Sequence, residues 1–376
     1  MKQMTQVAVL GEPVIEESQT SPSSCLRATL LTGLCVFMLI VVAYRLVGFS
    51  INRSDVAEYI NWSHNLLGFK GFASHLPGYP AILAVGRLVT LGLLGDAVFA
   101  QAICLAFWGV GVVLAWLLLR RLAPEIADIG ALLIGLFPFV GVSMAAFPYA
   151  DIPPFSVFLA ACLAGISDWP WTFAALTAGG LLMHQALYPF YLLLALWCWW
   201  KRKVSLIHLL ACCLPFAAYY VAGALAQNDA FWVLKYHSKT HLKPRGSVPV
   251  FAGMIGTVMR SSAKEKVKGV LLIAVFAAAL CCSWNSFKRK DWLMLSFSIP
   301  IALYCVVANE AIAWIIVRLA KILVFPACMW LAAHPSFTAA LRKRSVRLPL
   351  VLALAVSQFV WAACIWKFFT SGKNWL

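Results

Sequence analysis

Apolar runs long enough to cross a lipid bilayer recur along almost all of this chain of 376 residues. Hydrophobic residues make up 62% of it and charged residues only 12%, which leaves too few polar side chains to cover a water-soluble globule. A helix needs roughly 20 apolar residues to span the hydrocarbon layer, and helices satisfy their own backbone groups there. The sequence therefore predicts an all-α, polytopic transmembrane helical bundle of about 11 spans.

Four basic clusters determine the predicted topology. Lys and Arg favour the cytoplasmic ends of membrane spans, so we place all four on that side. The clusters are Arg120-Arg121, Lys201-Arg202-Lys203, Lys288-Arg289-Lys290 and Arg342-Lys343-Arg344. The corresponding spans are 26–49, 97–119, 127–147, 153–167, 171–186, 187–200, 204–226, 268–286, 292–308, 312–333 and 348–366. The segment 79–94 then lies along the outer interface, since Arg87 would be costly at mid-bilayer.

A single membrane domain is predicted to follow a polar N-terminal segment. Residues 1–25 lack the basic-then-apolar order of a signal peptide, so we interpret them as a disordered cytoplasmic tail. Residues 26–370 form the transmembrane domain. Within it, 50–96 hold the first extracytoplasmic loop with an interfacial helix, and 227–267 form a basic extracytoplasmic loop.

The net charge of +16 does not indicate a nucleic-acid partner. The Lys and Arg residues stand in short clusters between apolar runs instead of forming one soluble basic face. The twelve cysteines show no metal-ligand spacing, and we expect them to fill apolar volume.

The first outer loop offers candidates for chemistry. Asp55 and Glu58 are three residues apart and share one face of a helix. A partly desolvated carboxylate there can act as a general base or help to hold a divalent cation, although a solvated loop acid is the alternative. His75 precedes the rigid turn Pro77–Pro80, where it could bind a phosphate or hydroxyl or serve the turn alone.

Two further segments place charge at the edge of apolar runs. Asp151 lies in a predicted outer turn, 147–151, between two long apolar runs, where an acid is costly without a partner, so it is a functional candidate. Arg318 and Lys321 recur with Glu310 and Trp314 at helical spacing, and cations within a span usually face a cavity or an anion.

The outer loop 227–267 is basic, against the positive-inside rule. An anionic ligand such as phosphate or pyrophosphate would explain it, and anionic lipid headgroups are the alternative. The residues concerned are Lys235, His237, Lys239, His241, Lys243 and Arg245.

The order of these elements resembles the GT-C superfamily of membrane glycosyltransferases. The branch with protein O-mannosyltransferases and the aminoarabinose transferase of lipid A is the most similar. The resemblance covers about residues 27–330. It comprises a first span, a loop with Arg53, Asp55, Glu58 and Tyr59, the Pro77–Pro80 turn, an interfacial helix, a span ending in Arg120-Arg121, and Pro148-Tyr149-Ala150-Asp151.

The resemblance implies sugar transfer from a polyprenyl-phosphate-linked donor to a lipid, glycan or protein acceptor. It implies that Asp55 is the base that acts on the acceptor, that Asp151 is a second acidic position, and that Arg318 binds the lipid phosphate. The enzyme would work on the periplasmic face of a bacterial inner membrane. Glu58 is the third catalytic candidate, and Asp55 and Asp151 would be the ligands if Mg²⁺ or Mn²⁺ takes part. The candidate substrate-binding residues are Arg53, Tyr59, His75, Tyr149, Lys235, His237, Lys239, His241, Arg245, Arg318 and Lys321.

Two other functions compete with sugar transfer. A transporter or flippase of lipid-linked glycans would need outer basic groups and a cavity, and it predicts charges deep in the bundle. Another polytopic transferase, such as an acyl or phosphoethanolamine transferase, would favour an intramembrane His beside an acid. His184 is the candidate for that role, although a histidine satisfied by its neighbours in the bundle is the more ordinary interpretation.

Overall fold

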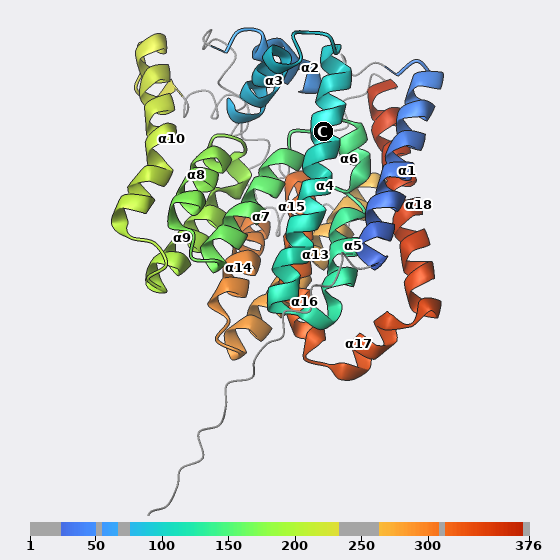
Figure 1. The fold of residues 1–376 in the computed structure, drawn as a ribbon. Helices are drawn as coiled ribbons and strands as arrows, with labels where there is room; N and C mark the ends of the chain where they lie inside the picture. Colours follow the sequence, from blue (N-terminus) through green and yellow to red (C-terminus); the bar gives the residue numbers. More distant parts are fainter. Residues whose placement is uncertain (1–23, 50–54, 67–75, 233–262, 308–312, 371–376) are drawn as a thin grey trace, which may run out of the picture.

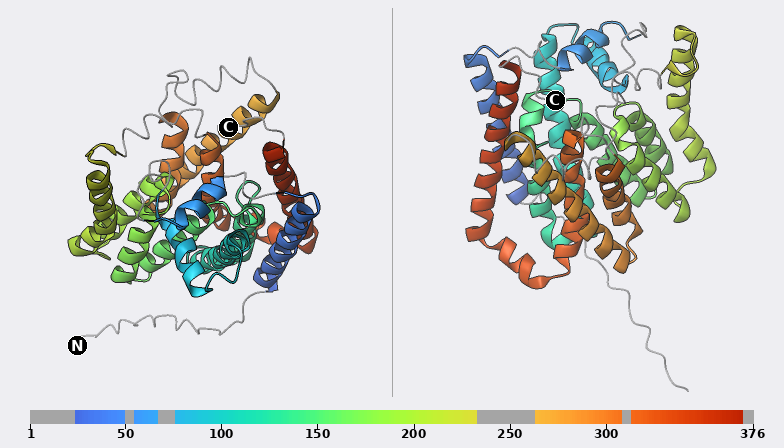
Figure 2. Two further views of the ribbon diagram at one scale, coloured as in Figure 1. Left: turned by 90° about the horizontal axis from the view of Figure 1, so that it is seen from above. Right: turned by 180° about the vertical axis from the view of Figure 1, so that it is seen from behind.

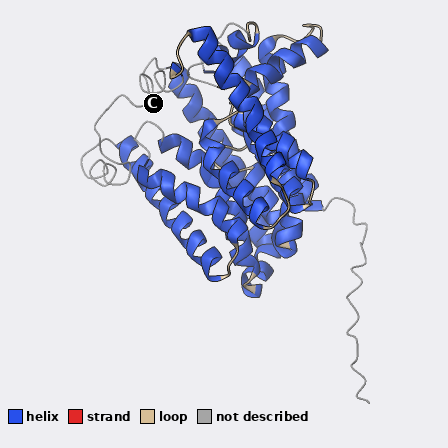
Figure 3. Ribbon diagram, turned by 90° about the vertical axis from the view of Figure 1, so that its left-hand side faces the viewer, coloured by secondary structure: helices blue, strands red, loops and turns tan. Residues whose placement is uncertain are grey.

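The computed structural model describes residues 24–49, 55–66, 76–232, 263–307 and 313–370. Every regular element in these ranges is a helix (Figure 3), which confirms the predicted all-α class. Six helical segments there are long and apolar enough to cross a membrane. They are α1 (Ser24–Leu46), α4 (Asp96–Leu122), α10 (Leu206–Gln227), Gly269–Lys288 within α13 (Ala263–Lys288), Ile315–Ala332, and Arg344–Lys367 within α18 (Arg344–Thr370).

Shorter helices replace several predicted spans, so the described ranges do not confirm eleven. The predicted span 127–147 is divided into α5 (Ala127–Gly135) and α6 (Val142–Ala146). The helices α8 (Pro170–Leu181) and α9 (Tyr188–Trp200) have 12 and 13 residues, below the roughly 20 that a perpendicular crossing requires. The remaining elements are α2 (Asp55–Ser63), α3 (Gly78–Val89), η3 (Pro124–Ile126), α7 (Ile152–Ile166), η4 (Gln185–Leu187), α14 (Trp292–Val307), α15 (Ala313–Leu319), η6 (Ala320–Leu323), α16 (Val324–Ala332) and α17 (Pro335–Arg342).

Pro138 explains why α5 and α6 are separate helices. Proline lacks the backbone N–H that would continue the helix, and its ring clashes with the carbonyl four residues earlier. Gln358 of α18 satisfies backbone groups that this break leaves open. Its Oε1 accepts from the Ser143 N–H at 3.0 Å, and its Nε2 donates to the Phe137 carbonyl at 2.7 Å.

A second irregular turn lies inside the span Ile315–Ala332. The chain tightens into the 3-10 turn η6 between α15 and α16. Pro326 follows, and it can neither donate to the Ile322 carbonyl nor pack against it without a clash, so a regular α-helix is disfavoured here. This turn contains Lys321.

The helices form a bundle capped at both ends by shorter helices. At one margin α1 and α18 stand side by side (Figures 1 and 2), and the Tyr44 hydroxyl donates to the Ala362 carbonyl at 2.9 Å. At the other margin α10 packs on α8 (Figure 1). The short helices α2 and α3 lie across one end of the bundle, and α17 lies across the opposite end (Figure 1). We call the α2 and α3 end the outer end.

The four basic clusters that we predicted to be cytoplasmic lie at the end of the bundle opposite α2 and α3. Arg121 donates to Ser167 at the end of α7, and Lys203 pairs with Asp168 at 2.7 Å. Arg342 of α17 donates to the Glu125 carbonyl at 3.0 Å. Arg289 reaches the Met329 carbonyl of α16, also at 3.0 Å. Members of all four basic clusters thus contact neighbours at one end, which agrees with the prediction that the clusters share one side.

Arg87 shows how α3 is held on the outer end. Its Nε donates to Asp96 Oδ1 at 3.0 Å, and its Nη2 donates to the Ser63 hydroxyl at 2.6 Å, so one side chain joins α3 to α2 and α4. Gly86 lies against Phe99 of α4, so closely that a Cβ would meet the ring at 1.7 Å. Arg87 therefore has polar partners at the outer end. This agrees with the expectation that its charge would be costly at mid-bilayer.

Gly180→Ala is expected to destabilise the fold by about 1–3 kcal/mol, because the added Cβ overpacks a filled core. The new methyl group would lie 1.9 Å from the Tyr191 hydroxyl, whose ring is buried. At the neighbouring Gly179 an added Cβ would meet no heavy atom within 4 Å, so Gly179→Ala is the matched control. Thermal unfolding in detergent measures both variants. Equal melting temperatures for the two would contradict this packing.

Candidate active site

Asp151 lies at the turn that joins α6 to α7. It is the N-cap residue of α7, where Asp often caps a helix, but its side chain makes no capping hydrogen bond. Its carboxylate instead forms an ion pair with Nη1 of Arg318 and contacts Nε2 of His184 at 3.1 Å. All three side chains are less than one-fifth exposed. Three segments far apart in the sequence therefore meet at one buried carboxylate.

His184 has both ring nitrogens engaged. Its Nδ1 accepts from the Ala186 N–H at 3.2 Å, so the proton of a neutral ring lies on Nε2 and is donated to Asp151. A histidine base needs a free nitrogen directed at its substrate. This arrangement supports positioning of Asp151 and does not suit the acyl-transfer role considered for His184.

Lys321 adds a second cation to the site. It is only 4% exposed, and its Nζ lies 3.5 Å from the centroid of the Phe155 ring. It is close enough to Asp151 and Arg318 to interact electrostatically with both. It also lines a cavity of about 10 Å³, room for about one water molecule. Among the described residues of this cluster, two cations therefore face one carboxylate.

Aromatic residues connect the cluster to the outer end. The Arg318 guanidinium lies 5.6 Å from the centroid of the Tyr149 ring. The Tyr79 hydroxyl of α3 donates to the Pro148 carbonyl at 3.1 Å, and the Tyr79 and Tyr59 rings are 5.3 Å apart. The structure thus joins the first-loop helices α2 and α3 to the turn that carries Asp151, two regions whose candidate residues are far apart in the sequence.

The turn at 147–151 is buried, so its predicted location on the outer surface is wrong. Phe147 is fully buried and Ala150 is 6% exposed. Cys104 of α4 contacts the Tyr149 carbonyl, and it lies eight residues beyond Asp96, about 12 Å along the helix axis. The physical reason is the short α6, which turns back inside the bundle before it reaches the outer end.

The structure describes only some of the residues predicted for the site. It brings together Asp151, Tyr149, Arg318 and Lys321. Asp55 is the first residue of α2, where only its backbone is described. Glu58 is exposed on the same helix. The positions Arg53, His75, Lys235, His237, Lys239, His241, Lys243, Arg245 and Glu310 lie outside the described residues, as does the side chain of Trp314.

Two contributors to this site were not predicted from the sequence. His184 was identified, but not its contact with Asp151, and Tyr79 was seen only as part of a turn. The sequence signal for His184 is its position at a break between two apolar helices. A polar residue at such a break can turn its side chain into the bundle.

The comparisons with known proteins assign no function. No protein-family model matches this chain, and no curated protein matches it in sequence. Among the described residues, no three His, Cys, Asp or Glu side chains are grouped so as to hold a metal ion. The function must therefore be inferred from the geometry of the buried cluster.

Proposed function

We propose that this chain is a membrane glycosyltransferase that moves a sugar from a polyprenyl-phosphate-linked donor to a lipid or glycan acceptor. The reaction takes place at the extracytoplasmic face of a bacterial inner membrane. The carrier is held in the bilayer, and its phosphate lies near the membrane surface. An enzyme for it needs buried cations, an apolar surround and a carboxylate near the outer end.

The observation that carries the proposal is the presence of two cations in a buried cluster. Arg318 and Lys321 both lie close to Asp151, and Lys321 is only 4% exposed. Cationic side chains are the usual partners of a phosphate group, and they are costly to bury without an anion. The lipid-linked phosphate is the anion that we propose, and the polyprenyl chain suits the apolar surround.

The proposed reaction is a direct displacement at the anomeric carbon. The acceptor oxygen bonds to that carbon while the bond from carbon to phosphate oxygen breaks, and the electron pair leaves with the polyprenyl phosphate. Asp55 takes the acceptor proton. Arg318 and Lys321 stabilise the leaving phosphate, and Asp151 acts as a positioning residue that orients Arg318.

Asp151 already holds two donors. One oxygen faces the Arg318 guanidinium, and the other faces the His184 N–H. We therefore assign Asp151 to positioning these side chains, and the proposed steps use no metal.

Asp55→Asn is expected to lower sugar transfer at least roughly 100-fold, the usual scale of a lost general base. Purified protein in detergent receives radiolabelled polyprenyl-phosphate sugars and a total lipid and glycan extract. Asp168→Asn makes the same chemical change at the opposite end, on an acid that is 67% exposed, and it should retain wild-type transfer. Full transfer by Asp55→Asn would remove Asp55 from the mechanism.

A transporter of lipid-linked glycans is the second candidate, and one observation favours it. The side chains of the charged cluster are largely buried within the protein, and a transporter likewise needs charged groups inside the bundle. The two candidates differ in the fate of the donor. A transferase cleaves the sugar from its carrier, whereas a transporter delivers the intact donor to the other leaflet.

A further inference from the structure

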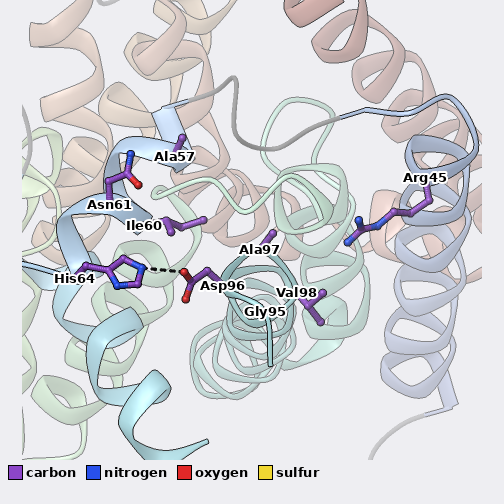
Figure 4. A pocket seen from close by; sticks show the side chains of 9 residues that line it. All are labelled: Arg45, Ala57, Ile60, Asn61, His64, Gly95, Asp96, Ala97 and Val98. Carbon is purple, nitrogen blue, oxygen red and sulfur yellow. Dashed lines mark hydrogen bonds and ion pairs between the residues drawn. The ribbon is translucent and has the colours of Figure 1, made fainter. Parts of the chain in front are cut away.

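A separate cavity lies at the outer end, between α1, α2 and α4. Its volume is about 530 Å³, within the roughly 300–1,000 Å³ of small-molecule sites. Figure 4 shows Arg45 reaching from α1 toward the first turn of α4, with Asn61 and His64 on the opposite wall. The residues that line it are Arg45, Ala57, Ile60, Asn61, His64, Gly95, Asp96, Ala97 and Val98.

The polar groups of this cavity favour an anion. Asp96 is the one acid among the described lining residues, and both of its oxygens are engaged, Oδ2 by His64 at 2.9 Å and Oδ1 by Arg87 at 3.0 Å. The Arg45 side chain is exposed and lines the cavity, and its guanidinium makes no hydrogen bond or ion pair with another described residue. With the charge of Asp96 compensated by Arg87, the described lining residues carry a positive surplus from Arg45.

The start of α4 adds donors to the same wall. Its N-cap residue is Gly95, which offers no side-chain cap. The amides of Ala97 and Val98 belong to the first turn, where no intrahelical carbonyl can accept from them. Backbone N–H groups at a helix N-terminus bind phosphate well when a cationic side chain lies opposite.

We propose that this cavity binds a phosphate ester, held between the Arg45 guanidinium and the first turn of α4. None of the described lining residues is Phe, Tyr or Trp, and the His64 ring is engaged by Asp96, so these residues favour a phosphate over a sugar ring or a base. The phosphate belongs either to a phospholipid headgroup of the outer leaflet or to a soluble ester. This site is distinct from the Asp151 cluster and does not depend on the proposed transfer reaction.

Thermal unfolding of the full chain in detergent tests the proposal. The probes are inorganic phosphate, dioctanoyl phosphatidylglycerol, and dioctanoylglycerol, which lacks the phosphate. A ligand that binds only the folded state raises the melting temperature with its concentration, from which an affinity follows. Stabilisation by inorganic phosphate would show that the phosphate group binds without a lipid, as a soluble ester requires. Stabilisation by the phospholipid alone would identify the headgroup.

Arg45→Gln should weaken binding of the active probe at least roughly tenfold, since a charge-assisted hydrogen bond is lost. Arg27→Gln removes the same charge from an exposed position at the other end of α1 and should bind as the wild type does. Ala57→Glu and Ala57→Gln add similar bulk to the cavity wall, and only the first adds a negative charge. It should bind more weakly than the second.

Three results would overturn the proposal. The first is that neither phosphate probe raises the melting temperature of the wild type. The second is that wild type and Arg45→Gln bind the active probe equally. The third is that Arg27→Gln weakens binding as much as Arg45→Gln does. Melting temperatures without ligand show whether each variant folds. Because no step of this test measures sugar transfer, its failure would leave the proposed reaction untouched.

Discussion

Asp151→Asn is expected to lower the free energy of unfolding by about 3–5 kcal/mol, the cost of leaving a buried charge without its partner. The variant keeps the shape of the side chain and removes its charge. Arg318 and Lys321 then face each other without the carboxylate that separates and compensates them. The expected loss is a large part of the stability of a typical domain.

Urea-dependent unfolding in mild detergent measures this loss. Asp168→Asn is the control, because Asp168 pairs with Lys203 but is 67% exposed, and an exposed pair contributes only about 0–1 kcal/mol. The double variant Asp151→Asn with Arg318→Gln should recover part of the stability, since it also removes the guanidinium that has lost its ion pair with Asp151. Equal stability of the wild type and Asp151→Asn would show that the ion pair contributes nothing.

Lys321→Met is expected to separate stability from function. Replacing buried ionic groups by apolar side chains of similar volume is often neutral or stabilises a fold by about 1–4 kcal/mol, provided that no remaining charge loses its partner. In this variant Asp151 keeps its ion pair with Arg318. Lys321 is buried, and its close contact among the described residues is the Phe155 ring. If it is kept for a phosphate ligand, the same substitution should lower sugar transfer at least roughly 100-fold.

Lys201→Met is the matched control for this prediction. The Lys201 ammonium also lies over an aromatic ring, at 4.6 Å from the centroid of Trp200, but the side chain is exposed at the opposite end. Its transfer rate should equal that of the wild type. A Lys321→Met protein that is less stable and fully active would reverse both expectations and make Lys321 a structural residue.

Composition and apolar runs were enough to predict an all-α membrane-like bundle, because lipid permits few alternatives. They could not predict how the runs are divided. The run 127–147 is apolar except for Asp128 and Ser143. Pro138 nevertheless breaks it, and Gln358 of a distant helix supplies hydrogen bonds to the broken ends. Such a partner is a tertiary feature that hydropathy does not contain.

The candidate site was predictable residue by residue but not as an assembly. Asp151 and Arg318 were both singled out because charge at the edge of an apolar run is costly. Their pairing spans 167 residues of sequence, and no spacing rule links positions so far apart. The burial of the Asp151 turn and the contact with His184 likewise depend on how the short α6 packs against α1, α4 and α18.

The most direct test of the proposed function follows the carrier itself. Purified wild-type protein in proteoliposomes receives a polyprenyl-phosphate sugar and the acceptor extract, and mass spectrometry measures free polyprenyl phosphate over time. We expect free carrier to accumulate in proportion to the sugar gained by the acceptor. An intact donor that only changes leaflet would contradict sugar transfer and identify a transporter.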